Sequence, residues 1–402
     1  MCNMMHLTRL LFCSFFPLVA FAVGPQLSDC DGAMRAVNAP EWTEAPVSKS
    51  VRELVEEHRD GKEPLKVETL RFDGLGPDKT VYNPAGWFDT TVGGKPIRVF
   101  AGRVESLDSE TDTEVGFFVE GRGKLAGKLV PTHVPIPTLH LQDPFVKKVG
   151  DELVIGGVKV ETDANGHVTS WSTVMYRDHG KGLDHLTPFF KGPKGMKDIR
   201  LSRLGNGQIL VLTRPQGKRK GGPGKVGYLV VDGLDDLADQ GAAGKLENAP
   251  LIPGMIPDAD WMGSNDPELL ANGNLGVLCH LATWKGSGKR KYAAGTFGIK
   301  PVYRKDPATG KWKVNRLLFT PPKVLFERAD FPGALGRSSK RTDLKDVVFP
   351  GKAELAGDKL VVYGGEGDRT VFRLELANPF THFASEDSGA IYEDENGHVL
   401  PQ

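Results

Sequence analysis

Short segments that alternate between apolar and polar residues recur along most of this chain, and they constrain its fold more than any other feature. Alternation with a period of two indicates strands that bury one face. Turn residues such as Asn165-Gly166 and Asn206-Gly207 separate the segments, as expected for antiparallel strands joined by tight turns. The strand-like segments are 98–104, 114–120, 152–161, 170–177, 209–214, 224–231, 275–282, 292–299, 359–363 and 370–376. Together with 49 Gly and 28 Pro residues, they predict an all-β fold.

Three stretches share an order of features that suggests the repeated blades of a β-propeller. An acidic residue precedes a Leu-led turn, an apolar strand and a second strand, and the three acidic residues are Asp198, Asp266 and Asp343. Their spacing exceeds the roughly 40 to 50 residues typical of propeller repeats, which implies insertions. We expect a five-bladed β-propeller, although periodicity alone leaves a pair of β-sandwiches as an alternative. The expected blades are 78–135, 138–190, 195–251, 257–323 and 337–379.

The remaining segments lie outside the expected propeller, which spans 78–385. Residues 1–22 combine a basic start with an apolar run that contains Pro17, and this pattern predicts a signal peptide and a secreted protein. The run is too short for a membrane span, which needs roughly 20 apolar residues. An N-terminal extension follows over 23–77, with a short helix at 51–60, and 386–402 form a C-terminal tail.

Composition excludes several classes of partner and leaves others open. Lys and Arg total 51 and Asp and Glu total 51, so the charge balance does not favour nucleic acid or an acidic membrane surface. His and Cys show no metal-ligand spacing, so we expect no metal and no cofactor. Without the signal peptide, Cys30 and Cys279 remain, and one disulfide is arithmetically possible. A free Cys279 packed as a small hydrophobe is the stronger alternative, and the oligomeric state stays open.

Several short motifs in a fixed order resemble one family, the domain of unknown function 1861 family. The resemblance covers the chain from about Leu70 onward. It implies a likeness to the five-bladed propellers of glycoside hydrolase family 130, which are mannoside phosphorylases and mannosidases. It therefore implies a sugar site where the innermost strands converge. The motifs are Val81 to Pro84, Ala101 to Glu105, Leu141 to Phe145, Lys197 to Arg200, Thr213 to Gly217, Trp261 to Asp266 and Lys340 to Phe349.

The resemblance assigns catalytic roles to three carboxylates. Asp143 lies in Gln142-Asp143-Pro144, which is similar to the Asp-Pro step that holds the proton donor in the relatives. Glycoside cleavage needs an acid for the leaving oxygen and a carboxylate or a phosphate for the attack, and Asp198 and Asp266 are the other candidates. Each of these aspartates alone could equally cap a turn.

Several positions depart from the family pattern. Met262-Gly263-Ser264-Asn265-Asp266 stands where the resemblance implies Gly-Gly-Ala-Asn-Glu, so Asp266 replaces Glu. Thr342 stands where it implies Pro, and Pro350-Gly351-Lys352 stands where it implies Ser-Gly-Gly. A carboxylate arm shortened by one methylene could cost on the order of 100-fold in rate. A glycan-binding protein without catalysis is therefore an alternative to an enzyme.

Further polar and aromatic residues near the blade starts are candidates for binding the sugar. The cationic ones could instead form structural salt bridges, and the tryptophan could pack in the core. We expect a glycosidase-like protein that binds and cleaves a mannoside or related glycoside, with a phosphorylase of the same fold and a propeller that binds proteins through its rim as alternatives. The candidate binding residues are Asn83, Arg103, Glu105, Arg200, Trp261, Asn265, Lys340, Arg341, Asp343 and Asp368.

Overall fold

The computed structural model describes residues 41–61, 65–217, 222–286, 288–333, 339–385 and 389–401. The predicted signal peptide and Cys30 lie outside these ranges. Cys279 is fully buried in a strand, as expected for a thiol that packs as a small hydrophobe. None of the described helices is long and apolar enough to cross a membrane.

The strands pair into five antiparallel groups, which we call blades 1 to 5. A short parallel pairing of Lys291 and Tyr292 with Asp346 and Val347 links blades 4 and 5. The strands are, for blade 1, β2 (Lys79–Val92), β3 (Lys95–Ser106), β4 (Glu114–Glu120) and β5 (Leu129–Pro131); for blade 2, β6 (Gln142–Val149), β7 (Glu152–Thr162), β8 (Val168–Arg177) and β9 (Thr187–Lys191); for blade 3, β10 (Arg200–Arg203), β11 (Ile209–Thr213) and β12 (Gly227–Val231); for blade 4, β13 (Trp261–Leu269), β14 (Leu275–Lys285), β15 (Lys289–Lys305), β16 (Trp312–Phe319) and β17 (Lys323–Glu327); and for blade 5, β18 (Asp346–Ala356), β19 (Lys359–Glu366), β20 (Thr370–Ala377) and β1 (Lys66–Thr69).

The first strand of each blade forms an inner ring. Strands β2, β6, β10, β13 and β18 contact one another in this order, and β18 returns to contact β2. A closed ring of first strands is the arrangement of a propeller. The predicted all-β propeller is therefore confirmed, in preference to a pair of sandwiches.

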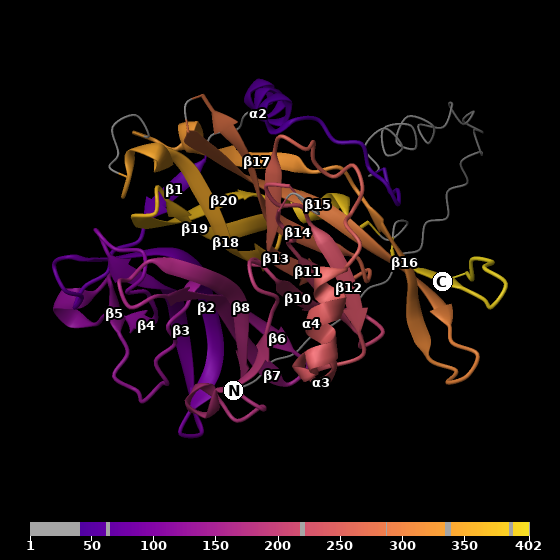
Figure 1. Cartoon of the computed structure of the whole chain (residues 1–402), viewed down its shortest axis with the longest axis horizontal. Helices are drawn as coiled ribbons and strands as arrows, with labels where there is room; N and C mark the ends of the chain where they lie inside the picture. The colour runs from indigo at the N-terminus through magenta and orange to yellow at the C-terminus, as the bar shows by residue number, and fades with distance from the viewer. Residues whose placement is uncertain are drawn as a thin grey trace, which may run out of the picture. The chain divides into compact units, whose positions relative to one another are not determined.

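Blade 5 combines strands from distant parts of the chain. Strand β1 pairs antiparallel with β20, and Lys66 lies opposite Glu375 while Thr69 lies opposite Phe372. Figure 1 shows β1 in indigo beside β20. The strand within the predicted N-terminal extension thus completes the last blade and closes the ring.

The apolar core is divided among the blade interfaces. Five clusters of buried side chains lie between successive blades, for example Val99 with Ile155 between blades 1 and 2, and Phe326 with Phe372 between blades 4 and 5. Each blade therefore buries both faces against its neighbours. The centre of the ring is left to the side chains of the first strands.

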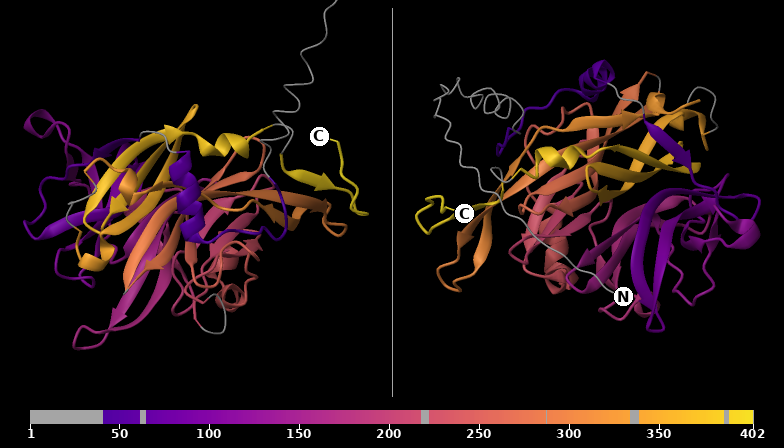
Figure 2. Two further views of the ribbon diagram at one scale, coloured as in Figure 1. Left: turned by 90° about the horizontal axis from the view of Figure 1, so that it is seen from above. Right: turned by 180° about the vertical axis from the view of Figure 1, so that it is seen from behind.

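Helix α2 (Val51–Asp60) confirms the predicted helical segment. It begins with a capping box between Ser50 and Glu53, which satisfies backbone amides at the helix start. Val51, Leu54 and Val55 pack into the core cluster of blade 4. The right-hand view of Figure 2 shows the helix in indigo over the orange strands, in agreement with its contact with β17.

Two further helices follow β12 and were not expected from periodicity. Helices α3 (Leu234–Ala238) and α4 (Gln240–Glu247) lie beside blade 3, whose sheet has three strands (Figure 1). Glycine and alanine make up much of α4, so its sequence carries almost no amphipathic pattern. The other short elements are the 3₁₀ helices η1 (Gly123–Leu125), η2 (Leu183–His185), η3 (Arg328–Asp330), η4 (Thr342–Leu344) and η5 (Pro379–His382), and strand β21 (Ile391–Glu393), which pairs with β15.

Candidate functional site

Four of the five inner strands contain a bulge close to a proline. The pairing register shifts around Pro84 in β2 and Pro144 in β6, just after Pro350 in β18 and two residues before Pro267 in β13. Proline cannot donate a ladder hydrogen bond, so inside a sheet it is confined to edges and irregular positions. Bulges re-aim the adjacent side chains.

Four polar residues of the inner part of the propeller have a left-handed backbone, and two of them, Asn83 and Asp143, lie at these bulges. Among the described non-glycine residues, Asn83, Asp143, Asp198 and Asp368 have φ of 43°, 47°, 59° and 53°, and His179 is the fifth with 52°. Asn and Asp tolerate this region best, yet it still costs about 1 to 3 kcal/mol per residue. Strained residues of this kind cluster at functional sites. Three of the four come from blades 1 to 3, and the fourth lies on the β19–β20 hairpin of blade 5.

Asp143 is held in place by its neighbours from blade 1. The Asn83 amide Nδ2 donates a hydrogen bond of 2.8 Å to Asp143 Oδ1, and Arg103 Nη1 lies 3.1 Å from the same oxygen. Burial alone would raise the pKa of Asp143, but the charges of Arg103 and Lys197 and the Asn83 bond leave it below its usual value. Asp143 is therefore a carboxylate at neutral pH.

Arg103 joins Asp143 to a second buried acid. Its Nη2 donates to Glu105 Oε1 over 2.6 Å, and Lys340 Nζ donates to Glu105 Oε2 over 2.6 Å. The Tyr82 hydroxyl also donates to Glu105, and the Arg103 guanidinium lies over the Tyr82 ring at 4.7 Å. The candidate binding residues Arg103, Glu105 and Lys340 thus form one connected network, in which each cation has a carboxylate partner.

Asp368 is the proton-holding carboxyl of the site. Burial raises its pKa to about 6, and the negative charges of Asp143 and Glu110 add to this, against the opposing charges of Arg103 and Arg341. A carboxyl with this pKa is about half protonated at pH 6 and about one-tenth protonated at pH 7. Asp143 and Asp368 therefore lose their protons over different pH ranges within one site.

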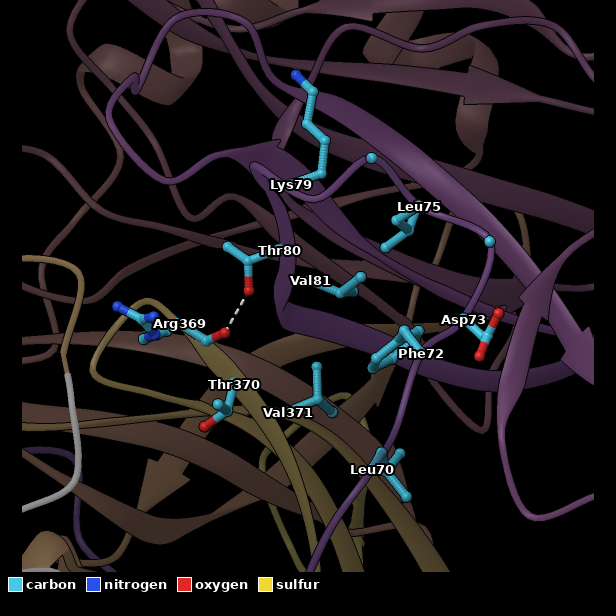
Figure 3. Close-up of a pocket in the computed structure, with 12 residues that line it drawn as sticks. Leu70, Phe72, Asp73, Leu75, Lys79, Thr80, Val81, Arg369, Thr370 and Val371 are labelled. Carbon is cyan, nitrogen blue, oxygen red and sulfur yellow. Dashed lines mark hydrogen bonds between the residues drawn. The ribbon is translucent and has the colours of Figure 1, made fainter. Parts of the chain in front are cut away.

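The hairpin that carries Asp368 is anchored to blades 1 and 5. The Gly367 amide donates to the Val347 carbonyl over 3.0 Å, and the Thr80 hydroxyl donates to the carbonyl of Arg369. Figure 3 shows the Thr80 bond at the edge of a cavity of about 410 Å³, which lies between the β1–β2 connection and β20. The bond fixes the turn on which Asp368 lies.

Asp198 lies among cations of blade 3 and a histidine of blade 4. Arg214 Nη1 is 3.1 Å from Asp198 Oδ2, and Arg200 Nη2 and His280 Nε2 are each 4.0 Å from the carboxylate. Burial would raise the pKa of Asp198, but Arg214, Lys197 and the other neighbours hold it well below its usual range. Asp198 is therefore ionised and cannot supply a proton.

Asn265 connects this group to blade 4. His280 Nδ1 lies 2.9 Å from Asn265 Oδ1, and Arg200 Nε donates to the Asn265 carbonyl over 3.0 Å. Burial lowers the pKa of His280 to about 3, so this imidazole is neutral. The Arg200 guanidinium also lies 4.6 Å from the centre of the Phe145 ring.

Asp266 forms ion pairs away from Asp143, Asp198 and Asp368. Its Oδ1 lies 3.2 Å from Lys147 Nζ, and its Oδ2 lies 2.9 Å from Lys352 Nζ and 3.0 Å from the amide of Ala353. Burial opposes ionisation, but the two lysines lower the pKa of Asp266 to about 2. None of these partners is shared with Asp143, Asp198 or Asp368. Asp266 and Lys352, two of the positions that depart from the family pattern, thus form an ion pair.

The remaining candidates lie at the edge of the site. Arg341 Nε donates to Asp343 Oδ1 over 3.1 Å and also binds Glu110, and Arg290 Nε lies 3.8 Å from Asp343. Trp261 is buried and donates from Nε1 to the Tyr292 hydroxyl over 3.1 Å. Sequence reasoning did not assign a role to Tyr82, Glu110, Lys197, Arg214, His280 or Tyr292, because their roles depend on contacts that only the folded structure shows.

Several buried polar atoms of the site have no hydrogen-bond partner among the described residues. They are Asn83 Oδ1, Arg103 Nε, Asp198 Oδ1, Ser264 Oγ and Asn265 Nδ2. Such atoms are few in native proteins and call for an explanation. They include both donors and acceptors, which suits a ligand with many hydroxyl groups.

Lys197 differs from the other cations. It is half-buried, its charge acts on both Asp143 and Asp198, and it forms no hydrogen bond or ion pair with another described residue. Its ammonium is therefore available for an anionic group. In the described part of the chain, no group of three or more His, Cys, Asp or Glu residues could hold a metal ion.

The solved structures that resemble this chain are propeller-fold proteins, and two come from Leishmania mexicana. The mannose phosphorylase MPT-4, solved in complex with phosphate ion, is 25% identical with a TM-score of 0.66, over 83% of this chain and 95% of that one. The GDP-Man-dependent mannosyltransferase MPT-1 is 26% identical with a TM-score of 0.66, over 84% of this chain and 96% of that one. A hypothetical protein from Leishmania major shares the fold, at 23% identity and a TM-score of 0.62, over 87% and 98% of the two chains.

No curated protein sequence matches this chain. The family described as "Protein of unknown function (DUF1861)" matches residues 57–382, which include every strand of the five blades, and strand β21 lies beyond the match. The match agrees with the resemblance found from the motifs. The chain therefore belongs to the DUF1861 family.

Proposed function

We propose that this chain is a carbohydrate-active enzyme that binds a mannoside or a related glycoside at the central site and cleaves or transfers its terminal sugar. The observation that carries the proposal is the group of four left-handed polar residues, Asn83, Asp143, Asp198 and Asp368, which belong to four blades. The two Leishmania mexicana proteins, which act on mannose, support it. We also propose that the protein acts outside the cell after export through residues 1–22.

The proton that the leaving oxygen needs comes from Asp368 in this proposal. Its raised pKa leaves about half of Asp368 protonated near pH 6, whereas Asp143 stays ionised beside Arg103. Donation by Asp368 leaves a carboxylate next to Asp143, and Arg103 offsets the repulsion between the two charges. Asp143, the donor suggested by the family resemblance, then stays ionised and accepts hydrogen bonds from the sugar, and in the reverse direction the proton returns to Asp368.

The acceptor of the sugar is phosphate in the version that the site favours. Lys197 has no partner among the described residues, and Arg200 and Arg214 lie beside Asp198 in the same region. Phosphate would attack the anomeric carbon, the glycosidic bond would break, and the products would be a sugar 1-phosphate and the shortened glycoside. Water in place of phosphate gives free sugar, and secretion favours this second version.

The test is turnover of mannosides, arabinosides and aryl glycosides by the full mature chain, with and without inorganic phosphate. Sugar 1-phosphate that forms only with phosphate supports phosphorolysis, and free sugar in both conditions supports hydrolysis. The matched controls are Asp143→Asn and Asp368→Asn. If the wild type releases no more product than these variants, the catalytic proposal is wrong.

A glycan-binding protein without catalysis is the second candidate. The observation that favours it is the pairing of Asp266 with Lys147 and Lys352, which neutralises one of the three expected catalytic carboxylates. Binding on a glycan array, together with no turnover of the same glycans in either buffer, would select this candidate.

A further inference from the structure

A row of aromatic rings extends from the buried part of the site through blade 4. The His280 ring stacks on Tyr292, with centres 5.6 Å apart and planes inclined by 6°. The Trp261 ring lies 5.7 Å from Tyr292, and the Trp284 ring lies 5.1 Å from Trp261. The four rings therefore form a continuous series on β13, β14 and β15.

The two ends of this series lie in different surroundings. At one end, His280 is fully buried beside Asn265 and 4.0 Å from Asp198. At the other end, Trp284 is 49% exposed. The series thus connects the polar residues of the site to an aromatic surface in contact with solvent.

Strand directions place Trp284 at the same end of the ring as the site. Trp261 is the first residue of the inner strand β13, ahead of Asn265, and it pairs with Ala282 near the end of the antiparallel strand β14. Trp284 comes two residues after Ala282 and lies opposite Arg290 of β15. The exposed indole therefore extends the site outward along blade 4.

A series of charged side chains also connects the surroundings of Trp284 to the site. Its cross-strand neighbour Arg290 lies 3.8 Å from Asp343, which is bonded to Arg341, and the charge of Arg341 acts on Asp368. An indole face flanked by a guanidinium and a carboxylate matches the chemistry of a pyranose, which has an apolar C–H face and a polar hydroxyl edge.

We infer that Trp284 is a binding platform for a second or later sugar of a glycan whose terminal residue lies in the central site. The substrate class is then an oligosaccharide, in preference to a monosaccharide linked to a small aglycone. Arg290 and Asp343 bind the hydroxyl groups of the sugar stacked on Trp284. The inference rests on the proposed sugar-binding function. It adds that the ligand is at least two sugar units long.

The experiment compares Trp284→Ala with Trp171→Ala in the full mature chain. Trp171 is a matched control, because it is 39% exposed and lies on β8, the third strand of blade 2. Mannose, mannobiose, mannotriose and mannotetraose of several linkages are titrated by calorimetry. We expect Trp284→Ala to weaken oligosaccharide binding about fivefold and to leave mannose binding unchanged, as loss of one stacking contact predicts. Trp171→Ala should change neither.

Trp284→Phe provides the second variant, since it keeps an aromatic face and should restore most of the affinity. The inference is overturned if oligosaccharides bind the wild type no more tightly than mannose, or if Trp284→Ala weakens mannose and oligosaccharides equally. Length-dependent binding through Trp284 without turnover supports the platform and refutes the enzyme. Turnover of short aryl glycosides with no effect of Trp284 refutes the platform and leaves the enzyme.

Discussion

Asp143 in blade 2 and Asp266 in blade 4 occupy equivalent places in sequence and opposite states in the structure. Both are buried, both precede a proline, and both lie at a bulge of an inner strand. Asp143 has a left-handed backbone, one cationic partner and the protonatable Asp368 nearby. Asp266 has two lysine partners and a backbone amide on its oxygens. An Asp-Pro step next to a bulge thus holds the carboxylate that we propose for catalysis in one blade and a structural ion pair in another.

The largest effect that we expect from this difference is a loss of catalysis when Asp143 or Asp368 is replaced. We expect Asp143→Asn and Asp368→Asn each to lower kcat by about 10²- to 10⁴-fold, the usual contribution of a general acid or base. Both variants should keep a midpoint of thermal unfolding close to that of the wild type. Steady-state kinetics with the best glycoside found in the screen measures the effect, and an unchanged kcat in Asp368→Asn would remove Asp368 from the mechanism.

At the Asp266 side the main effect should be on stability. Asp266→Ala leaves two poorly exposed lysines with Glu268 as their shared carboxylate partner, and we expect a loss of about 2 kcal/mol in the free energy of unfolding. The control is Asp235→Ala, which removes the ion pair of Arg177 with an 87% exposed aspartate and should cost about 0.5 kcal/mol or less. Denaturant unfolding distinguishes them, and equal losses would contradict the structural role of Asp266.

The pH dependence of kcat/KM should follow the ionisation of Asp368 and not that of Asp266. The pKa of folded Asp368 is about 6, so its protonated form dominates below that pH and is lost above it. We expect kcat/KM to fall by about tenfold for each pH unit above about 6. The same raised pKa makes the contribution of Asp368 to stability greatest below the pKa of an unfolded aspartate, and this contribution is lost as the pH rises through 6.

The Asp368→Asn variant supplies the check on this profile. Its unfolding free energy should vary less between pH 4 and pH 7 than that of the wild type, since the asparagine does not titrate. A kcat/KM that is flat across this range in the wild type would show that no group with a pKa near 6 takes part.

The smallest expected effect concerns phosphate, the proposed acceptor of the sugar. Lys197→Ala should raise the KM for phosphate by about tenfold, the usual cost of losing one charge-assisted bond, and should leave the KM for the glycoside unchanged. The neighbouring exposed Lys194→Ala serves as control. If Lys197→Ala affects neither KM, or if phosphate has no influence on the wild type, the phosphorylase version of the proposal fails.

The sequence predicted the fold well because strand periodicity and turn residues are local signals. The same signals missed the inner strands β2, β6, β10, β13 and β18, none of which is among the strand-like segments. They also missed β1, a short and largely exposed strand that pairs with β20, and α4, whose composition lacks an apolar stripe. These elements depend on tertiary contacts and leave little trace in a local pattern.

Site residues were predicted correctly where they lie in a recognisable motif. The prediction failed where ion pairs with other blades determine what a residue does. The motifs located Asn83, Asp143 and Asp198, and the structure shows that they share a strained backbone conformation. No motif indicates that Lys147 and Lys352 hold Asp266, because the three residues lie on different blades. Burial and ion pairing set the protonation state of each carboxylate, and both are properties of the assembled ring.

The pairing of β1 with β20 also has a consequence for the order of folding. During synthesis, blades 1 to 4 can form from residues already released, but β1 must wait for β20, near the other end of the described chain. Contacts of such high sequence separation form slowly. Asp368 lies on the β19–β20 hairpin, so its environment is complete only when the ring has closed. A nascent or partly folded chain therefore lacks the protonated carboxyl, and the activity we propose would appear only with the last step of folding.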